Sequence, residues 1–336
     1  MGFLSETPPF PSNRPIFCGI LANTLLSTVP GVSGAGPSPE KTLLTPVLDA
    51  ELIATGAITS YPIKPNTPTG CPTPASITRA MMTLCNISPL FINAGLRHVP
   101  TVPCYDVYGC VSEDPRFRDA LPLAKDLFHR GESIGAFLSD YSDLLVIGEC
   151  VPGGTTTALC VLRALGYSAS VSSSFADNPL SIKEEICSAA LTRISANGIR
   201  DPIDIIRYTG DPMMPVALGM IKTYTGNLIL AGGTQMLAVA ALSRVMSLRL
   251  PWVVTTCYVR DDPTANVRQL ADQIPVQISY VDPEFGNLGH TGLARYCIGE
   301  VKEGFGAGGA MCLAHLLGHS PEVIRNKILS TVSAYS

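Results

Sequence analysis

Short apolar runs that alternate with helix-like segments constrain the fold of this chain most. We expect six strands, at Ile16–Leu21, Leu90–Asn93, Asp143–Gly148, Asn227–Ala231, Trp252–Cys257 and Val276–Tyr280. Helices are expected to follow two of them, at Thr155–Leu165 and Thr234–Leu248. Continuous apolar strands alternating with helices are typical of a parallel sheet covered on both faces. The pattern predicts a three-layer α/β/α fold with a mostly parallel, Rossmann-like sheet, whose ligands bind at the carboxyl ends of the strands.

The first 75 residues differ from the rest of the chain. They are rich in Pro, Gly, Thr and Ser, notably from Val29 to Pro37 and from Pro62 to Pro74. We expect long ordered loops there, or a lid-like segment around the core. Such loops are either functional or plain connections on the surface.

Composition excludes several classes of protein. Hydrophobic residues make up 46% of the chain and charged residues 15%, which rules out a disordered chain. The net charge is −4, and the Lys and Arg residues are scattered singly, so nucleic-acid binding is disfavoured. No run reaches the roughly 18 apolar residues that a membrane span needs.

The cysteines and histidines carry no metal-site signature. There are eleven cysteines and no C-x-x-C pair, and no signal peptide is recognisable. Free buried thiols in a reducing cytoplasm are therefore expected. His315 and His319 have the i, i+4 spacing of metal ligands, but no third ligand is apparent, so we interpret them as a surface pair on the C-terminal helix.

One glycine-rich turn stands where a strand passes into a helix. It contains Gly153, Gly154, Thr155 and Thr156, with Glu149 just before it. Glycines let a ligand approach the backbone, and a helix N-terminus attracts anions. The spacing is close to that of a P-loop, but Gly154 stands in place of the lysine. The turn is either a phosphate site or an ordinary capped helix start.

Two further turns have similar composition. The fourth expected strand is followed by Gly232, Gly233 and Thr234. This turn is either a second nucleotide contact or simply the connection between the strand and the next helix. Gly304 and Gly306 follow Glu303 near the carboxyl end, where too few residues remain for a dinucleotide-binding unit. This turn is either a small-residue helix start that permits close packing, or it projects Glu303 into a cleft, where a carboxylate with little charge around it can serve as a general base. The three turns together suggest an anionic ligand and an acid–base step.

At these residues the chain resembles the nicotinate-nucleotide:dimethylbenzimidazole phosphoribosyltransferase family. Gly148-Glu149-x-x-x-Gly153-x-Thr155-Thr156 is similar to its G-E-x-x-x-G-N-T-T motif, and Glu303-Gly304-x-Gly306-Ala307 to its E-G-T-G-A motif. The resemblance runs from about residue 143 to residue 317. The earlier part looks like an uncharacterised branch of that family found in archaea and cyanobacteria.

The resemblance implies a function and a site. It implies a homodimer that moves ribose 5-phosphate from nicotinate mononucleotide to a flat nitrogen base, giving an α-ribotide for cobamide assembly. It implies that Glu303 is the general base and that Gly153 to Thr156 hold the phosphate. Glu149 is a second candidate base or positioning group, and the reaction requires no metal or cofactor.

The resemblance also implies a small helical subdomain from both chain ends. We divide the chain into residues 1–75, a nucleotide-binding catalytic domain at 76–318 and a C-terminal helix at 319–336. Three positions depart from the family pattern: Gly154 for asparagine, Lys302 for glycine and Phe305 for threonine. The acceptor base stays open. A nucleotide phosphorylase or hydrolase and a non-catalytic nucleotide-binding regulator are the alternatives.

Overall fold

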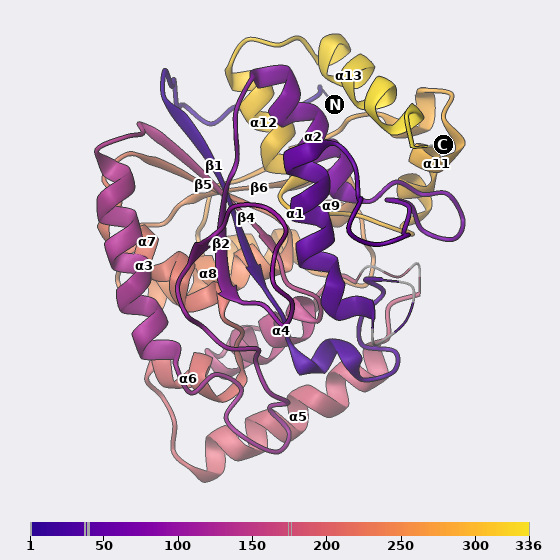
Figure 1. The fold of residues 1–336 in the computed structure, drawn as a ribbon. Coiled ribbons are helices and arrows are strands. Elements are labelled where there is room, and N and C mark those ends of the chain that lie inside the picture. Colours follow the sequence, from indigo (N-terminus) through magenta and orange to yellow (C-terminus); the bar gives the residue numbers. More distant parts are fainter. Residues whose placement is uncertain (1, 37, 39–40, 174, 176, 336) are drawn as a thin grey trace.

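One parallel sheet organises the chain (Figure 1). The structure is a computed structural model that describes residues 2–36, 38, 41–173, 175 and 177–335. The seven strands lie in the order β3-β2-β1-β4-β5-β6-β7, and all neighbouring strands are parallel. Their bounds are β1 Pro15–Ala22, β2 Leu90–Gly95, β3 Tyr105–Asp106, β4 Leu144–Cys150, β5 Asn227–Ala231, β6 Trp252–Thr256 and β7 Ile278–Val281.

The strand order reverses between β1 and β4. These two strands pair directly, with Gly19 opposite Gly148 and Leu21 opposite Cys150. In open parallel sheets, the crevice at the carboxyl ends of two such strands is the usual ligand site. The topology therefore points to the turn after β4.

The six predicted strands and the parallel α/β fold are confirmed. Strand β3 was not predicted. It has two residues, Tyr105 and Asp106, both exposed at the sheet edge, so it leaves no apolar run in the sequence.

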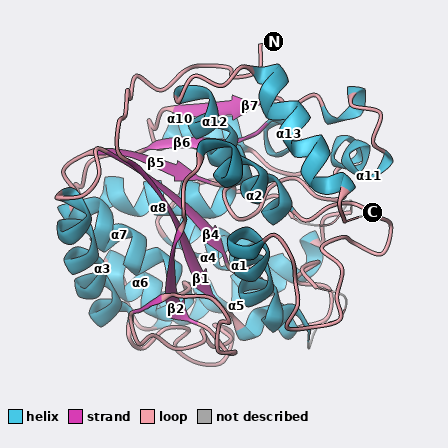
Figure 2. Ribbon diagram, turned by 45° about the horizontal axis from the view of Figure 1, so that its top comes forward, coloured by secondary structure: helices cyan, strands magenta, loops and turns pink. Residues whose placement is uncertain are grey.

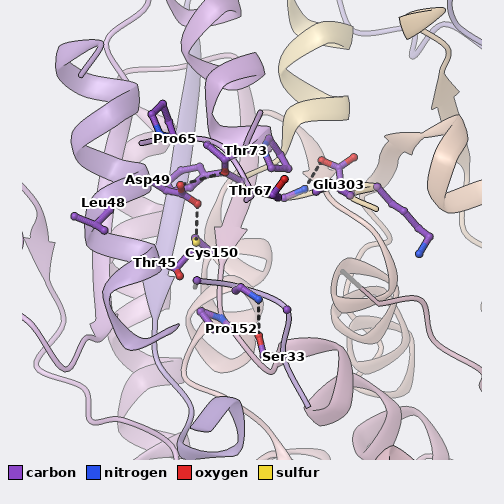
Figure 3. Close-up of a pocket in the computed structure, with 18 of the residues that line it drawn as sticks. Ser33, Thr45, Leu48, Asp49, Pro65, Thr67, Thr73, Cys150, Pro152 and Glu303 are labelled. Atoms are coloured by element: carbon purple, nitrogen blue, oxygen red, sulfur yellow. Dashed lines mark hydrogen bonds between the residues drawn. The ribbon is translucent and has the colours of Figure 1, made fainter. Parts of the chain in front are cut away.

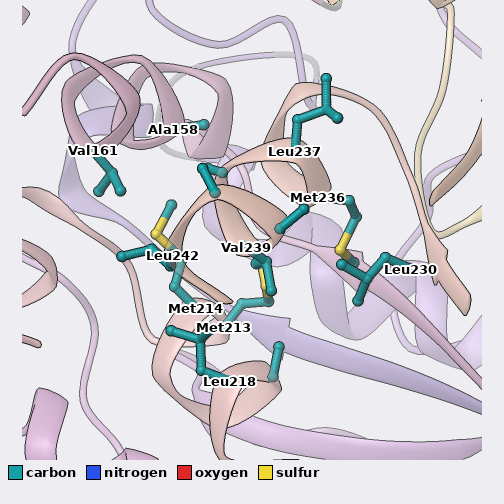
Figure 4. Close-up of a cluster of buried hydrophobic side chains, with 14 of the residues drawn as sticks. Ala158, Val161, Met213, Met214, Leu218, Leu230, Met236, Leu237, Val239 and Leu242 are labelled. Atoms are coloured by element: carbon teal, nitrogen blue, oxygen red, sulfur yellow. The ribbon is translucent and has the colours of Figure 1, made fainter. Parts of the chain in front are cut away.

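Helices cover both faces of the sheet (Figure 2). Alternate residues of β4 explain why its sequence is apolar throughout: Leu145 and Ile147 face one hydrophobic core, and Leu144 and Val146 face the other. On the first face lie α3 Ala124–Ser139, α4 Gly154–Ala164, α5 Leu180–Ala196, α6 Pro202–Thr209, α7 Met213–Thr223, α8 Thr234–Val245 and α10 Val267–Gln273. Figure 4 shows part of this core, where methionine and aliphatic side chains of α4, α7 and α8 pack against β5.

The second face is covered by helices from both ends of the chain. They are α1 Thr45–Thr55, α2 Pro74–Cys85, α12 Ala307–Leu316 and α13 Pro321–Ser333. Helix α2 packs against both α12 and α13, and Figure 1 shows these helices together near the two termini. This grouping agrees with the helices expected from the chain ends.

Short elements complete the connections. They are α9 Cys257–Arg260, α11 Thr291–Ala294 and the 3-10 turns Leu25–Thr28, Lys41–Leu44, Phe285–Asn287 and Arg295–Ile298. Helix α1 interrupts the loops expected in the first 75 residues. Within the described part of the chain, none of the helices has the length and apolar character that crossing a membrane requires.

Candidate functional site

A cavity of about 940 Å³ opens at the carboxyl ends of the central strands. The end of β4 and the start of α4 line it from Glu149 to Thr155, and the start of α8 lines it from Gly233 to Gln235. The segment from Val301 to Phe305 forms another part of the wall. The N-terminal region closes the cavity with α1 and the loop that contains Pro62 to Pro68 (Figure 3). Three segments expected from the sequence thus meet in one place.

Glu149 is the last-but-one residue of β4 and is buried, with an exposed fraction of 6%. Its Oε2 accepts a hydrogen bond of 2.9 Å from the backbone N–H of Val151. Burial, and next the charge of Asp211, raise the pKa of Glu149 to about 8. The carboxyl group therefore holds its proton at neutral pH more readily than an ordinary glutamate.

Glu303 is held at the start of α12 by backbone and side-chain donors. Its Oε1 accepts from the N–H groups of Gly304 and Gly308, at 3.1 and 3.2 Å, and its Oε2 accepts from Thr255 Oγ1 at 3.3 Å. Burial raises the pKa of Glu303 to about 7, although these hydrogen bonds oppose the shift. A fixed carboxylate that titrates near neutral pH has the properties of a general base.

Two glutamates, predicted from motifs far apart in the sequence, line the same cavity. The charge of Glu303 is also one of the smaller causes, after burial, of the raised pKa of Glu149. One carboxyl group that keeps its proton and one that releases it near pH 7 can divide acid and base roles between them.

The turn before α4 has the form of an anion cradle. Gly153 has a φ of 82°, which favours glycine, and α4 begins at Gly154 without a side-chain cap. Gly153, Gly154 and Thr155 line the cavity. The first turn of the helix, with its partial positive charge, therefore faces the space that a ligand would occupy.

Side chains from α8 complete this cradle. Thr234 is buried, and its Oγ1 has no hydrogen-bond partner among the described residues. The Gln235 amide lies against Gly154, so closely that a Cβ at residue 154 would be 2.1 Å from Gln235 Nε2. Gln235 therefore fills the space next to the position where the family motif has asparagine.

Three of the predicted binding residues do not line the cavity. They are Thr156, Gly232 and Gly306. Thr156 is fully buried, and a Cβ at Gly306 would lie 3.0 Å from the Cβ of Ala231. At Gly306 the glycine therefore lets α12 pack closely against the sheet.

Lys302 and Phe305, the other departures from the family motif, are both buried. Lys302 Nζ donates to the carbonyl oxygens of Ser173 and Phe175, each at 3.0 Å, and lies 3.3 Å from Asp262 Oδ2. Phe305 packs edge-on against Phe91, with ring centroids 5.9 Å apart. Both residues therefore hold the Glu303 turn in place.

Three polar residues in or directly behind the site were not predicted. Asp211 Oδ2 accepts from Thr157 Oγ1 at 2.6 Å, Gln235 lies against the cradle, and Asp49 lines the cavity from α1. Gln235 directly follows a predicted turn, which could have indicated it. Asp49 and Asp211 follow no expected strand.

The two histidines at the end of α12 were assigned wrongly to one helix. His315 lies in the last turn of α12, whereas His319 lies in the connection to α13. His315 Nδ1 is 3.3 Å from the carbonyl oxygen of His319. Among the described residues, no group of three or more His, Cys, Asp or Glu side chains is placed to hold a metal ion.

Comparison with known proteins places the chain in a family. It is 40% identical over 328 residues to a UPF0284 protein of Methanosarcina mazei, covering 94% of this chain and 93% of that protein. It is 42% identical over 320 residues to a UPF0284 protein of Thermococcus gammatolerans, covering 93% and 96%. The chain belongs to the UPF0284 family. No protein-family model matches it.

Solved structures share the fold of this UPF0284 member. A nicotinate-nucleotide-dimethylbenzimidazole phosphoribosyltransferase from Thermus thermophilus has a TM-score of 0.64 and 15% identity, covering 95% of this chain and 83% of that one. CobT from the same organism has a TM-score of 0.63 and 14% identity, covering 97% and 85%. The fold that the motif resemblance implied is confirmed.

Proposed function

We propose that this UPF0284 protein is a phosphoribosyltransferase that moves ribose 5-phosphate from nicotinate mononucleotide to a flat nitrogen base. The product would be an α-ribotide of the kind used as the lower ligand of cobamides. The observation that carries the proposal is the convergence of Glu303, Glu149 and the Gly153–Thr155 turn on one cavity. The shared fold of the phosphoribosyltransferase from Thermus thermophilus supports it.

The phosphate of the donor would bind at the start of α4. Its anionic oxygens would meet the backbone of Gly154 and Thr155, where the helix presents its positive end. The Thr234 hydroxyl, which lacks a hydrogen-bond partner among the described residues, is available to the same ligand. Binding there would place the ribose toward the two glutamates.

The transfer step needs one proton acceptor. A ring nitrogen of the acceptor base attacks C1′ of the ribose, and the bond from C1′ to the nicotinate nitrogen breaks. The nicotinate ring loses its positive charge as it leaves and needs no proton. The acceptor gives up its N–H proton to Glu303, whose proximity and basicity would contribute about 10²–10⁴-fold to the rate. Attack opposite the leaving ring gives the α-ribotide.

Glu149 would have a supporting role. Its raised pKa keeps the carboxyl group protonated at neutral pH, so it can donate a hydrogen bond to the ribose or phosphate without repelling the phosphate charge. No step of this reaction calls for a metal or cofactor. We further propose that the protein acts as a homodimer, as the motif resemblance implies, and that it works in the cytoplasm, as its free cysteines suggest.

A product assay tests the proposed function. The purified protein is incubated with nicotinate mononucleotide and, separately, with dimethylbenzimidazole, benzimidazole and adenine, and products are identified by mass and NMR. We expect free nicotinate and an α-ribotide in equal amounts. Nicotinate without ribotide would identify a hydrolase instead. Donor binding without consumption would identify a nucleotide-binding regulator.

A further inference from the structure

The carboxyl group of Asp49 lines the cavity, but it has no role in the proposed reaction. It lies on α1, and its side chain points toward Cys150 (Figure 3). Figure 3 shows it apart from Glu303, which enters the pocket from the turn before α12. Both carboxyl groups can therefore face one ligand from different sides.

The protein satisfies the hydrogen-bonding capacity of Asp49 only in part. Its Oδ2 accepts from the Cys150 thiol at 3.5 Å, and its Oδ1 accepts from Thr73 Oγ1 at 3.3 Å. A thiol is a weak donor, and a carboxylate has about four lone-pair sites. Among the described residues, no Lys, Arg or His forms an ion pair with Asp49. Burial raises the pKa of Asp49 to about 7.

The surroundings of Asp49 suit a flat ring. Leu48, the preceding residue of α1, lines the cavity with Ile58 and Ile63, and these three side chains belong to one apolar cluster. Such a wall binds the face of an aromatic base. A half-buried carboxyl group next to it favours a ligand with a donor on its edge, because burial of a polar group without partners is unfavourable.

We propose that Asp49 recognises a hydrogen-bond donor carried by the six-membered ring of the acceptor base. This inference rests on the proposed transferase function. It predicts that an acceptor with an amino or hydroxyl group on that ring is preferred to dimethylbenzimidazole, whose corresponding edge carries two methyl groups. Asp49 would thus determine specificity, whereas Glu303 would take the proton.

Competition between matched acceptors tests the inference. The wild-type protein, Asp49→Asn and Asp49→Ala are assayed with nicotinate mononucleotide and with benzimidazole, 5-aminobenzimidazole, dimethylbenzimidazole or adenine. We expect the wild type to prefer 5-aminobenzimidazole to benzimidazole by about tenfold or more in kcat/KM. Adenine shows whether an amino group on a purine is recognised equally well.

The variants should change the preference and not the chemistry. Asp49→Ala removes both acceptor oxygens and should reduce kcat/KM for 5-aminobenzimidazole to about the level of benzimidazole, whereas Asp49→Asn, whose amide oxygen still accepts a hydrogen bond, should keep part of the preference. Asp272→Asn, at an exposed residue of α10 that does not line the cavity, removes the same kind of charge and should behave like the wild type. Thermal unfolding of each variant shows whether it is folded.

Each negative outcome has a distinct meaning. If the wild type makes ribotides without preferring the amino-substituted ring, or if Asp49→Ala keeps the preference, Asp49 does not recognise the acceptor and the transferase proposal stands. If Asp49→Ala lowers turnover of all acceptors equally, Asp49 has a general role and the inference is wrong. If the wild type forms no ribotide with any acceptor, both proposals fail.

Discussion

Glu303 is the side chain on which the proposed chemistry depends most directly. We expect Glu303→Gln to lower kcat by about 10²–10⁴-fold, because an amide keeps the shape of the carboxyl group but cannot accept the proton. Donor binding should stay unchanged, as measured by calorimetry with nicotinate mononucleotide. Glu6→Gln, at an exposed position, is the control.

In the wild type the rate should rise as the pH increases through about 7, because only the ionised form of Glu303 acts as a base.

A variant with normal turnover would show that another group takes the proton. The same conclusion would follow if the rate of the wild type fell over that pH interval.

Glu149 should make the stability of the protein depend on pH. Its pKa is raised from 4.5 to about 8 by burial, so the folded protein holds a proton there that the unfolded chain releases. The folded state therefore loses stability as the pH rises from about 4.5 to about 8. Glu149→Gln removes this loss, and we expect it to gain on the order of 1–3 kcal/mol relative to the wild type between about pH 5 and pH 8.

Denaturant unfolding of both proteins at several pH values measures this difference. Parallel curves for the wild type and Glu149→Gln would show that Glu149 ionises normally in the folded protein.

The start of α4 and the start of α8 form one binding element, since Gln235 packs directly on Gly154. We expect Gly154→Ala to displace the Gln235 amide, because the new Cβ would lie 2.1 Å from Nε2. The end of a glutamine side chain moves easily, so stability should change by less than about 1 kcal/mol. Affinity for nicotinate mononucleotide should fall about tenfold through loss of a hydrogen bond to an anion.

A double-mutant cycle makes this prediction specific. Gln235→Ala should weaken donor binding to the same extent as Gly154→Ala, and the double variant should be no weaker than either single one. Losses that add up, to about a hundredfold in the double variant, would mean that the two residues act independently.

The N-terminal residues cover the edge of the sheet at β7, and they bring the start of the chain next to its C-terminal part. The Ser5 N–H donates to the Tyr280 carbonyl at 3.0 Å, and the Asp282 N–H donates to the Phe3 carbonyl at 2.8 Å. Phe3 is buried and packs against His315 of α12, with ring centroids 5.5 Å apart. An uncovered edge strand is a template for association between molecules.

We therefore expect deletion of residues 2–6 to lower the free energy of unfolding by roughly 2–4 kcal/mol and to promote aggregation. Phe3→Ala removes the buried ring but keeps the backbone pairing with β7, so it should destabilise the protein without causing aggregation. Thermal unfolding and light scattering separate the two effects. A deletion variant that stays stable and monodisperse would contradict this role of the N-terminal segment.

Local pattern was sufficient to predict the strands, the parallel sheet and the strand-end turns. Each of these depends on residues that are close in the sequence: a continuous apolar run, a glycine turn, a helix start. Glu149 and Glu303 were identifiable because they lie within such turns, and the resemblance of those turns to a known family suggested their roles. Strand β3 was missed because two exposed residues produce no pattern.

Only the tertiary structure decided which other side chains reach the cavity. Asp49 meets Cys150 across 101 residues of sequence. Asp211 does not line the cavity, but its charge helps to raise the pKa of Glu149, which does. Gln235 occupies space that exists only because residue 154 is a glycine on a different helix. Hydrophobic periodicity is a local property of the sequence. The convergence of these side chains depends instead on the order of the strands in the sheet and on the position of α1 next to the strand ends. The candidate general base could therefore be predicted from the sequence, but the groups that surround the ligand could not.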